Sequence, residues 1–428
     1  FVVIIFTSGT IFPYVTGKFV AFRILVGLSL IFFFLGIIFD KIRADKYWDR
    51  LIDSIKSPLG IVIGIFTFIF TLAGFFGIDP VHSFWSNFER GEGSLQIIFL
   101  YAFFLLLSTF LTEEKDWKKF FEVFVISAFL SILYGIGDGL GIVSGTNTPL
   151  NEVRRFGGSL GNPAYLATYL LFASFFSSYL LLSEKQNLKK SKKYLLISSI
   201  VIFIVFFLWA ATRGAFLGLI GAGIVGAIYL FVIKKNWRKI ISLITIGVLL
   251  VIGGGYTYKD SQLIQSLPVS RLYDLSLDTR NFQERLIMWD MTIRAVKDRP
   301  LLGYGAENFD HIFYEYYNPS YYDPAERGVG NFGPWFDRAH STTFDYLSQT
   351  GVLGLISYWG IFAMFFLLFV KSKLHKRESA ILATLILVMP VAYLIQGQVL
   401  FEILPLYLSF YVFLAFASFK LYLGPRET

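Results

Sequence analysis

The fold class of this chain is indicated most clearly by residues 338–377, RAHSTTFDYLSQTGVLGLISYWGIFAMFFLLFVKSKLHKR. The centre of this stretch, from Thr342 to Val370, is mainly apolar and longer than the ~20 residues that a helix needs to cross ~30 Å of hydrocarbon. Thr342 and Asp345 have the spacing of a capping box, which predicts that the helix begins there. The stretch is therefore predicted to be a membrane span with Arg338 and His340 at its mouth.

The same pattern extends along nearly the whole chain. Hydrophobic residues make up 55%, aromatic residues 19% and charged residues only 16%, which is far from the average of soluble domains. Apolar runs of about the length of a span recur, separated by short charged loops. They predict an all-α polytopic membrane protein with about twelve transmembrane helices. The predicted spans are residues 1–16, 20–39, 58–76, 94–111, 119–143, 163–183, 195–212, 214–233, 240–257, 342–370, 379–397 and 402–421.

Lys and Arg are distributed unevenly between the two sets of loops. One set holds 23 of the 38 basic residues, which the positive-inside rule assigns to the cytoplasm. Both ends of the chain are then cytoplasmic, and because the chain begins at Phe1 rather than Met, we expect further residues upstream. The net charge of +8 is mostly an orientation signal and gives no support for nucleic-acid binding. The basic loops are residues 40–57, 112–119, 184–193, 234–239, 371–377 and the tail from 420.

One outer segment, residues 258–341, is much longer than the others and holds nine basic and twelve acidic residues. An unstructured loop of this length is uncommon, so we expect a small folded cap between two membrane parts, residues 1–257 and 342–428. Residues 281–300 place an apolar residue every three or four positions, which predicts an amphipathic helix. The predicted apolar stripe is Phe282, Leu286, Trp289, Ile293 and Val296.

Two arginines stand out by position. Arg285 falls at the edge of that stripe, where a helix on the membrane surface would hold it near the lipid headgroups; the alternative is an Arg that snorkels along its own helix. Arg213 lies between two long apolar runs, in ATRGAFLG (211–218). A tight outer turn is one explanation, but positive charge is least expected in an outer turn, and we favour a function for Arg213.

Arg154 and Arg155 precede a glycine-rich turn, GGSLGNP (157–163). Glycines beside arginines permit close approach of a phosphate-bearing ligand, although the same glycines also make an ordinary loop. For either arginine alone the structural explanation is slightly favoured.

His340 would stand just outside the first turn of the span predicted over residues 342–370. A lone His is usually a packing or capping residue, but several arginines accompany this one on the outer face. Arginines without a matching carboxylate cluster suit a diphosphate on a lipid carrier, because Arg makes bidentate bonds to phosphate oxygens. A His with an ordinary pKa of ~6.5 can take a proton from an attacking hydroxyl.

The sequence offers little for metal-dependent chemistry. It contains no Cys, which removes disulfides, thiolate catalysis and Cys-ligated metals from consideration. It shows no D-x-D, H-x-x-x-H or E-x-x-H pattern, so metal-dependent glycosyl or phosphoryl transfer is not favoured.

Three motifs in order along the chain resemble the O-antigen ligase and polymerase superfamily. His340-Ser341 with Gly351 and Gly354 matches the pattern H-[NSQ]-x9-G-x-x-G. RPLLGYGAENF (299–309) is similar to P-L-L-G-x-G-x-x-x-F, and ATRGAFLG resembles an S-R-G-A segment with Thr212 in place of Ser. The similarity extends to the twelve-span layout and the long outer loop.

The resemblance implies a GT-C-like membrane glycosyltransferase of the bacterial inner membrane. It would move a glycan from an undecaprenyl diphosphate carrier to an acceptor on the outer face, without a metal or a nucleotide cofactor. By position, Arg213 and Arg285 would bind the diphosphate and His340 would activate the acceptor, while Arg154 or Arg155 corresponds loosely to a further outer-loop Arg.

The resemblance leaves the acceptor open. It is a lipid A core sugar for a ligase, a second lipid-linked glycan for a polymerase, or a protein Ser or Thr for an O-oligosaccharyltransferase. We favour the ligase, whose motif is the best match. A small-anion transporter is the alternative from another class, but it would place ionisable residues near the middle of spans, and here the polar residues gather on one face.

Overall fold

The computed structural model describes residues 1–143, 145, 149–150, 153, 155–183, 188–267, 270–273, 280–318 and 335–424. This part of the chain is helical and contains no β-strand. The helices are α1 (Thr16–Phe39), α2 (Lys41–Lys56), α3 (Pro58–Phe75), α4 (Pro80–Trp85), α5 (Ser94–Phe110), α6 (Glu114–Gly139), α7 (Pro163–Ser183), α8 (Lys190–Trp209), α9 (Arg213–Ile233), α10 (Arg238–Thr257), α11 (Gln262–Gln265), α12 (Ser270–Tyr273), α13 (Arg280–Asp298), α14 (Phe309–Tyr316), α16 (Thr342–Ser372), α17 (Leu374–Arg377), α18 (Ala380–Gly397) and α19 (Leu404–Ser418).

Within the described residues, ten helices are long and apolar enough to cross a membrane, and α5 is a shorter apolar helix. The chain is therefore an all-α polytopic membrane protein, as predicted. The ten helices are α1, α3, α6, α7, α8, α9, α10, α16, α18 and α19.

The span predicted over residues 1–16 is wrong. Only Val2–Ile4 forms a short 3₁₀ helix there, and α1 begins at Thr16. The chain turns in between, where Gly9 has φ +86° and the backbone N–H of Thr7 donates to the carbonyl of Pro13. The apolar composition of residues 1–16 predicts a helix, but the turn residues in this segment interrupt it.

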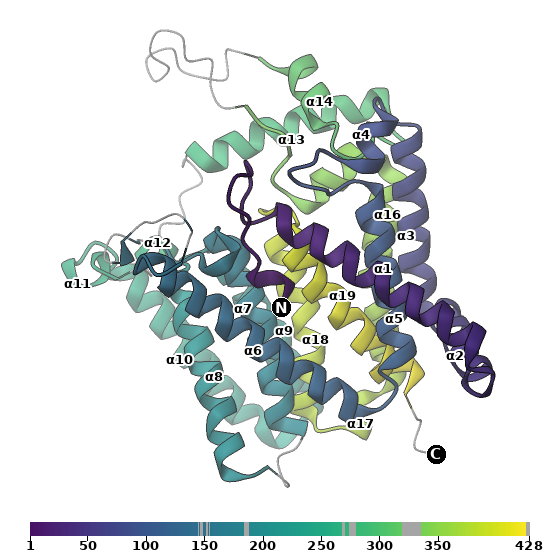
Figure 1. The fold of residues 1–428 in the computed structure, drawn as a ribbon. Coiled ribbons are helices and arrows are strands. Elements are labelled where there is room, and N and C mark those ends of the chain that lie inside the picture. Colours follow the sequence, from purple (N-terminus) through teal and green to yellow (C-terminus); the bar gives the residue numbers. More distant parts are fainter. Residues whose placement is uncertain are drawn as a thin grey trace.

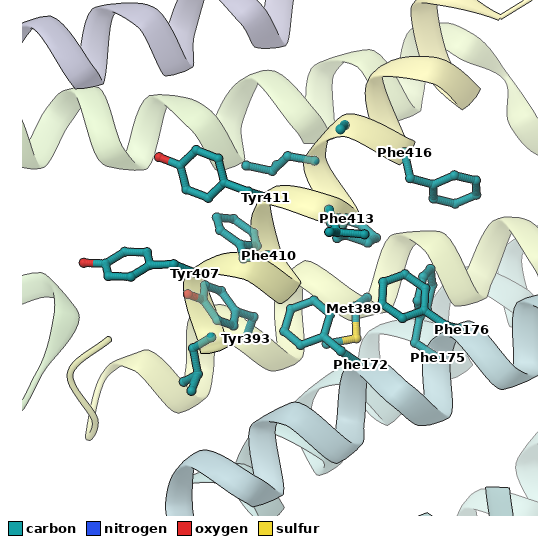
Figure 2. Packing of buried hydrophobic residues seen from close by; sticks show 14 of the residues in the cluster. Phe172, Phe175, Phe176, Met389, Tyr393, Tyr407, Phe410, Tyr411, Phe413 and Phe416 are labelled. Atoms are coloured by element: carbon teal, nitrogen blue, oxygen red, sulfur yellow. The ribbon is translucent and has the colours of Figure 1, made fainter. Parts of the chain in front are cut away.

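The centre of the bundle is α19, which packs against α5 and α7. Figure 2 shows Phe172, Phe175 and Phe176 of α7 lying against the aromatic residues of α19. The rings of Phe175 and Phe413 have centroids 5.5 Å apart, and those of Tyr393 and Phe410 are stacked at 4.3 Å. Each such pair contributes about 1 kcal/mol beyond the area it buries, so this aromatic layer stabilises the position of α19 among its neighbours.

The two ends of the bundle differ (Figure 1). Helices α13 and α14 lie across one end, which we call the cap end, together with residues 335–341; α2 and α17 lie at the opposite end. At the opposite end the buried Lys420 donates to Glu114 at 3.0 Å and to Glu378 at 2.7 Å, which ties the start of α6 to the start of α18. The cap end carries the residues that the sequence singled out.

The predicted amphipathic helix forms as α13, but the buried face differs from the predicted stripe. Met288, Met291 and Ala295 are buried, whereas Leu286 and Ile293 are exposed by 40% and 49%. The predicted stripe lies on another side of the helix: α13 packs on α14 and α16 with the side that carries Met288, Met291 and Ala295 and leaves part of the predicted stripe open.

Candidate functional site

His340 lies in a tight turn directly before α16, with φ +56°. Its Nδ1 is 3.1 Å from the backbone carbonyl oxygen of Arg338. A carbonyl only accepts, so Nδ1 carries the proton and donates, which leaves the lone pair of Nε2 available as a base. The ring is held edge-on by Phe336 and Phe401, at centroid distances of 5.9 and 5.1 Å.

The electrostatic surroundings keep His340 neutral. Burial lowers its pKa from the ordinary value of 6.5, the hydrogen bond to Arg338 opposes this, and the positive charge of Arg285 lowers it further. At neutral pH the imidazole is therefore in the form that accepts a proton.

Neighbouring elements fix the turn that presents His340. The backbone N–H of Ala339 donates to Oδ1 of Asp345 at 2.7 Å, and the indole N–H of Trp289 on α13 donates to the carbonyl of Ala339 at 3.0 Å. The helix begins at Thr342 as predicted, but Ser341 is the N-cap residue and Asp345 reaches past it to Ala339. The carboxylate thus secures the turn before the helix and does not complete a capping box.

Arg338 has a structural role. It forms ion pairs with Glu92, at 2.6 Å, and with Glu307, and all three side chains are at most 5% exposed. Burial alone lowers the pKa of Arg338, but the carboxylates of Glu307 and Glu92 raise it well above its usual value, so the guanidinium stays charged. The cluster joins the segment before α5, the segment before α14 and the start of α16.

Arg213 and Arg285 come together at the cap end from distant parts of the sequence. Arg213 is the first residue of α9, and its Nε donates to the backbone carbonyl of Arg271 at 3.1 Å. Arg285 is on α13, one turn before Trp289. Burial lowers the pKa of Arg285; Glu284 opposes this, and Arg213 lowers it further. Arg285 in turn lowers the pKa of His340, so Arg285 interacts electrostatically with both Arg213 and His340.

The Nε of Arg285 is buried and has no hydrogen-bond partner among the residues that the structure describes. A buried guanidinium nitrogen in this condition is costly, and an anionic ligand would relieve the cost. This favours ligand binding over snorkelling for Arg285.

Arg155 adjoins Arg213 and is anchored by two hydrogen bonds. Its Nε donates to the carbonyl of Ala210 at 3.1 Å, and its Nη2 donates to Oγ1 of Thr212 at 3.1 Å. Burial lowers the pKa of Arg155 to about 10, with further lowering by Arg271 and Arg213. Arg154, the other candidate from this turn, lies outside the described residues.

Arg271 is a member of this group that sequence reasoning missed. It belongs to the four-residue helix α12, which lies beside α9. Its carbonyl holds Arg213, and its positive charge acts on Arg155. No local pattern in the sequence distinguishes it from the other basic residues of the outer segment.

The two glycine motifs of the sequence dock on each other. Gly351, with φ +62° and ψ −164°, interrupts α16, and the segment 300–305 fits against the interruption. The carbonyl oxygens of Pro300 and Leu301 accept from the backbone N–H groups of Val352 and Leu353, at 2.8 and 3.3 Å. On the other side, the N–H groups of residues 304 and 305 donate to the carbonyls of residues 348 and 349, at 2.8 and 2.9 Å. The backbone of this segment fills the space beside Gly351 that a side chain would occupy.

No group of three or more His, Cys, Asp or Glu in the described part of the chain is arranged to hold a metal ion. The candidate site comprises His340 with Arg285, which acts on it, and a chain of arginines that continues from Arg285 to Arg213 and from there to Arg271 and Arg155. Such a group can bind an anion and accept a proton.

Residues 198–359 match a protein-family model described as O-antigen ligase. The matched range includes Arg213, Arg285, His340 and both glycine motifs, and it confirms the resemblance inferred from them. No curated protein matches the chain.

Proposed function

We propose that this chain, whose residues 198–359 match the O-antigen ligase family model, is a membrane glycosyltransferase that transfers a glycan from an undecaprenyl-diphosphate-linked donor to an acceptor hydroxyl. The observation that supports it best is the buried Nε of Arg285, which lies beside the charge of Arg213 and has no hydrogen-bond partner among the described residues. In this proposal the site faces the outer side of the bacterial inner membrane and both ends of the chain are cytoplasmic. Residues 1–257 and 342–428 form the membrane part, and residues 258–341 form the cap.

The arginines are the proposed binding site for the diphosphate. A guanidinium presents a planar pair of donors that fits phosphate oxygens, and it remains charged even when partly buried. Arg213 and Arg285 would bind the donor's diphosphate directly, and Arg155 would add positive charge beside Arg213. Their mutual repulsion without ligand favours the state in which a diphosphate lies between them.

His340 is the proposed base. The acceptor oxygen bonds to the anomeric carbon of the donor while the bond from that carbon to the diphosphate oxygen breaks. The proton of the acceptor hydroxyl passes to Nε2 of His340, and the electron pair of the broken bond stays on the lipid diphosphate. The arginines stabilise the charge that develops on this leaving group. The proposed reaction uses no metal and no nucleotide cofactor.

The acceptor that we propose first is a lipid A core sugar, because the His340-Ser341 and Gly351 pattern is nearest to the ligase branch. A second lipid-linked glycan or a protein hydroxyl are the alternatives within the superfamily. A small-anion transporter remains the alternative from another class, since a cluster of arginines also binds free anions.

The test is a transfer assay with purified protein in detergent. A lipid-diphosphate-linked glycan is offered with each class of acceptor, in the presence of EDTA, to wild type, His340→Ala and His311→Ala. His311, on α14 at the cap end, is exposed and serves as the matched control. We expect EDTA-resistant transfer by wild type and His311→Ala and none by His340→Ala. Donor binding without transfer to any acceptor would refute the proposal, and anion flux in vesicles would favour the transporter.

A further inference from the structure

Glu402 is a buried carboxyl group that the proposed reaction does not use. It lies between α18 and α19 and is 6% exposed. The hydroxyl groups of Tyr346 on α16 and Tyr393 on α18 donate to its two oxygens. Tyr407 and Tyr358 surround Tyr346: the hydroxyl oxygens of Tyr346 and Tyr407 are 3.3 Å apart, and the rings of Tyr346 and Tyr358 have centroids 4.3 Å apart. We call Glu402 with these four tyrosines the tyrosine cage.

The tyrosine cage supplies hydrogen bonds to the Glu402 carboxyl group without a cation. A tyrosine hydroxyl has one proton to donate: those of Tyr346 and Tyr393 go to the two oxygens of Glu402, which leaves the proton of Tyr407 for the hydroxyl oxygen of Tyr346. Among the described residues no Lys or Arg forms an ion pair with Glu402. A buried carboxylate without a cation is retained only where hydrogen bonds replace its water, so the tyrosines account for its presence inside the bundle.

The cage compensates for the break in α16. Gly351 interrupts the helix, so residues 342–350, the first half, are separated from residues 352–372, the second half. Tyr346 is in the first half and Tyr358 is in the second. Since the ring of Tyr358 packs on that of Tyr346 at 4.3 Å and Tyr346 donates to Glu402, the cage connects the two halves to each other. Through Tyr393 and Tyr407 it also connects them to α18 and α19.

The residues next to Glu402 support the His340 turn. The ring of Phe401 is 5.1 Å from the ring of His340. The carbonyl of Leu400 accepts from both the backbone N–H and Oγ1 of Thr342, at 3.1 and 3.0 Å. A displacement of Glu402 would therefore move both the ring that packs on His340 and the first residue of α16.

From these contacts we propose that Glu402 is a positioning residue. Through the tyrosine cage it fixes the first half of α16 and the loop that contains Leu400 and Phe401, and these two segments hold His340 beside the proposed diphosphate site. The inference rests on the proposed function for its effect on catalysis. Its structural part, the placement of the His340 ring, holds independently of any reaction.

The experiment compares Glu402→Leu, Glu402→Gln and the matched control Tyr411→Phe. Figure 2 shows Tyr407 and Tyr411 projecting from the same side of α19, and the Tyr411 hydroxyl is buried without a hydrogen-bond partner among the described residues. The readouts are kcat, KM for the lipid-linked donor, thermal unfolding and the titration of His340. The titration is followed by NMR in histidine-labelled protein, which has four His residues, with His340→Ala to assign the signal.

We expect Glu402→Leu to lower kcat by about tenfold or more while the donor KM changes by less than about threefold, because the base moves and the arginines do not. The pKa of His340 should rise toward 6.5 as its packing loosens. Glu402→Gln retains an acceptor and a donor for the cage and should keep kcat within about threefold of wild type. Tyr411→Phe should match wild type in every readout.

Two results would overturn the inference. The first is a folded Glu402→Leu protein with unchanged kcat and an unchanged His340 titration. The second is a loss in Glu402→Gln as large as in Glu402→Leu together with a lost limb of the pH profile, which would make the carboxyl group a participant in proton transfer. If wild type transfers no glycan, the proposed function is wrong but the positioning role of Glu402 is still tested. The His340 titration in Glu402→Leu and Tyr411→Phe measures that role without any reaction.

Discussion

The backbone of Leu301 occupies the space that a side chain on Gly351 would need: a Cβ atom placed on Gly351 would lie 2.5 Å from the carbonyl carbon and oxygen of Leu301. The glycine also has φ +62°, a conformation that L side chains rarely adopt. Both facts reflect the same contact, in which residues 300–305 pack on the break in α16. At the break, residues 300–305 of the cap therefore contact the end of the half-helix that follows His340.

Gly351→Ala should therefore be severely disruptive. The new methyl group meets backbone, which cannot move aside like a side chain, and the positive φ adds strain of about 1 kcal/mol or more. We expect loss of transfer and a melting temperature several degrees lower in detergent. Gly223→Ala is the matched control, because a Cβ there meets nothing within 4 Å inside a helix that also spans the membrane. Wild-type activity in Gly351→Ala would show that the break is not required.

Arg213→Ala and Arg285→Ala should each lower kcat/KM for the lipid-linked donor, by roughly 100-fold, without preventing membrane insertion. Arg213→Lys should recover only part of this, because an ammonium group keeps the charge but loses bidentate geometry. Arg294→Ala is the control, since Arg294 on α13 pairs with Asp290 at 2.6 Å on the exposed surface. Transfer at the wild-type rate would remove the altered arginine from the site.

Arg271→Ala tests the arginine that the sequence did not single out. The substitution keeps the backbone carbonyl that accepts from Nε of Arg213, so any effect reports the guanidinium itself. We expect a several-fold rise in donor KM, measured by initial rates at varied donor, and little change in kcat. An unchanged KM would limit the role of Arg271 to its carbonyl group.

The sequence predicted the membrane class and most spans because hydropathy is a local property. It did not predict the break at Gly351, since an apolar run looks the same whether or not another segment docks into it. Arg338 was visible at the mouth of the span, but its partner Glu92 lies 246 residues away and only the fold brings them together. Glu402 also went unnoticed, because a single acidic residue at the edge of the predicted span 402–421 does not reveal which tyrosines the fold brings to it.

Arg338→Leu should destabilise the protein by about 3–5 kcal/mol, because it leaves the carboxylates of Glu92 and Glu307 buried without a partner. The triple variant with Glu92→Gln and Glu307→Gln removes those charges and should regain part of the loss. Arg294→Ala breaks an exposed pair and should cost less than about 1 kcal/mol. Thermal or denaturant unfolding in one detergent measures all three. Equal stability of Arg338→Leu and wild type would contradict the structural role of the cluster.

The pH dependence of transfer follows from the lowered pKa of His340. The base is active when neutral, so kcat should fall as pH falls through a pKa below the ordinary 6.5 and should be level at neutral pH. Arg285→Ala removes a positive charge that lowers this pKa, so in that variant the acidic limb should move to higher pH even where residual activity is small. His311→Ala should leave the limb in place. The measurement is kcat at saturating donor from pH 4.5 to 8. An acidic limb that stays in place in Arg285→Ala would show that the charge of Arg285 does not act on His340.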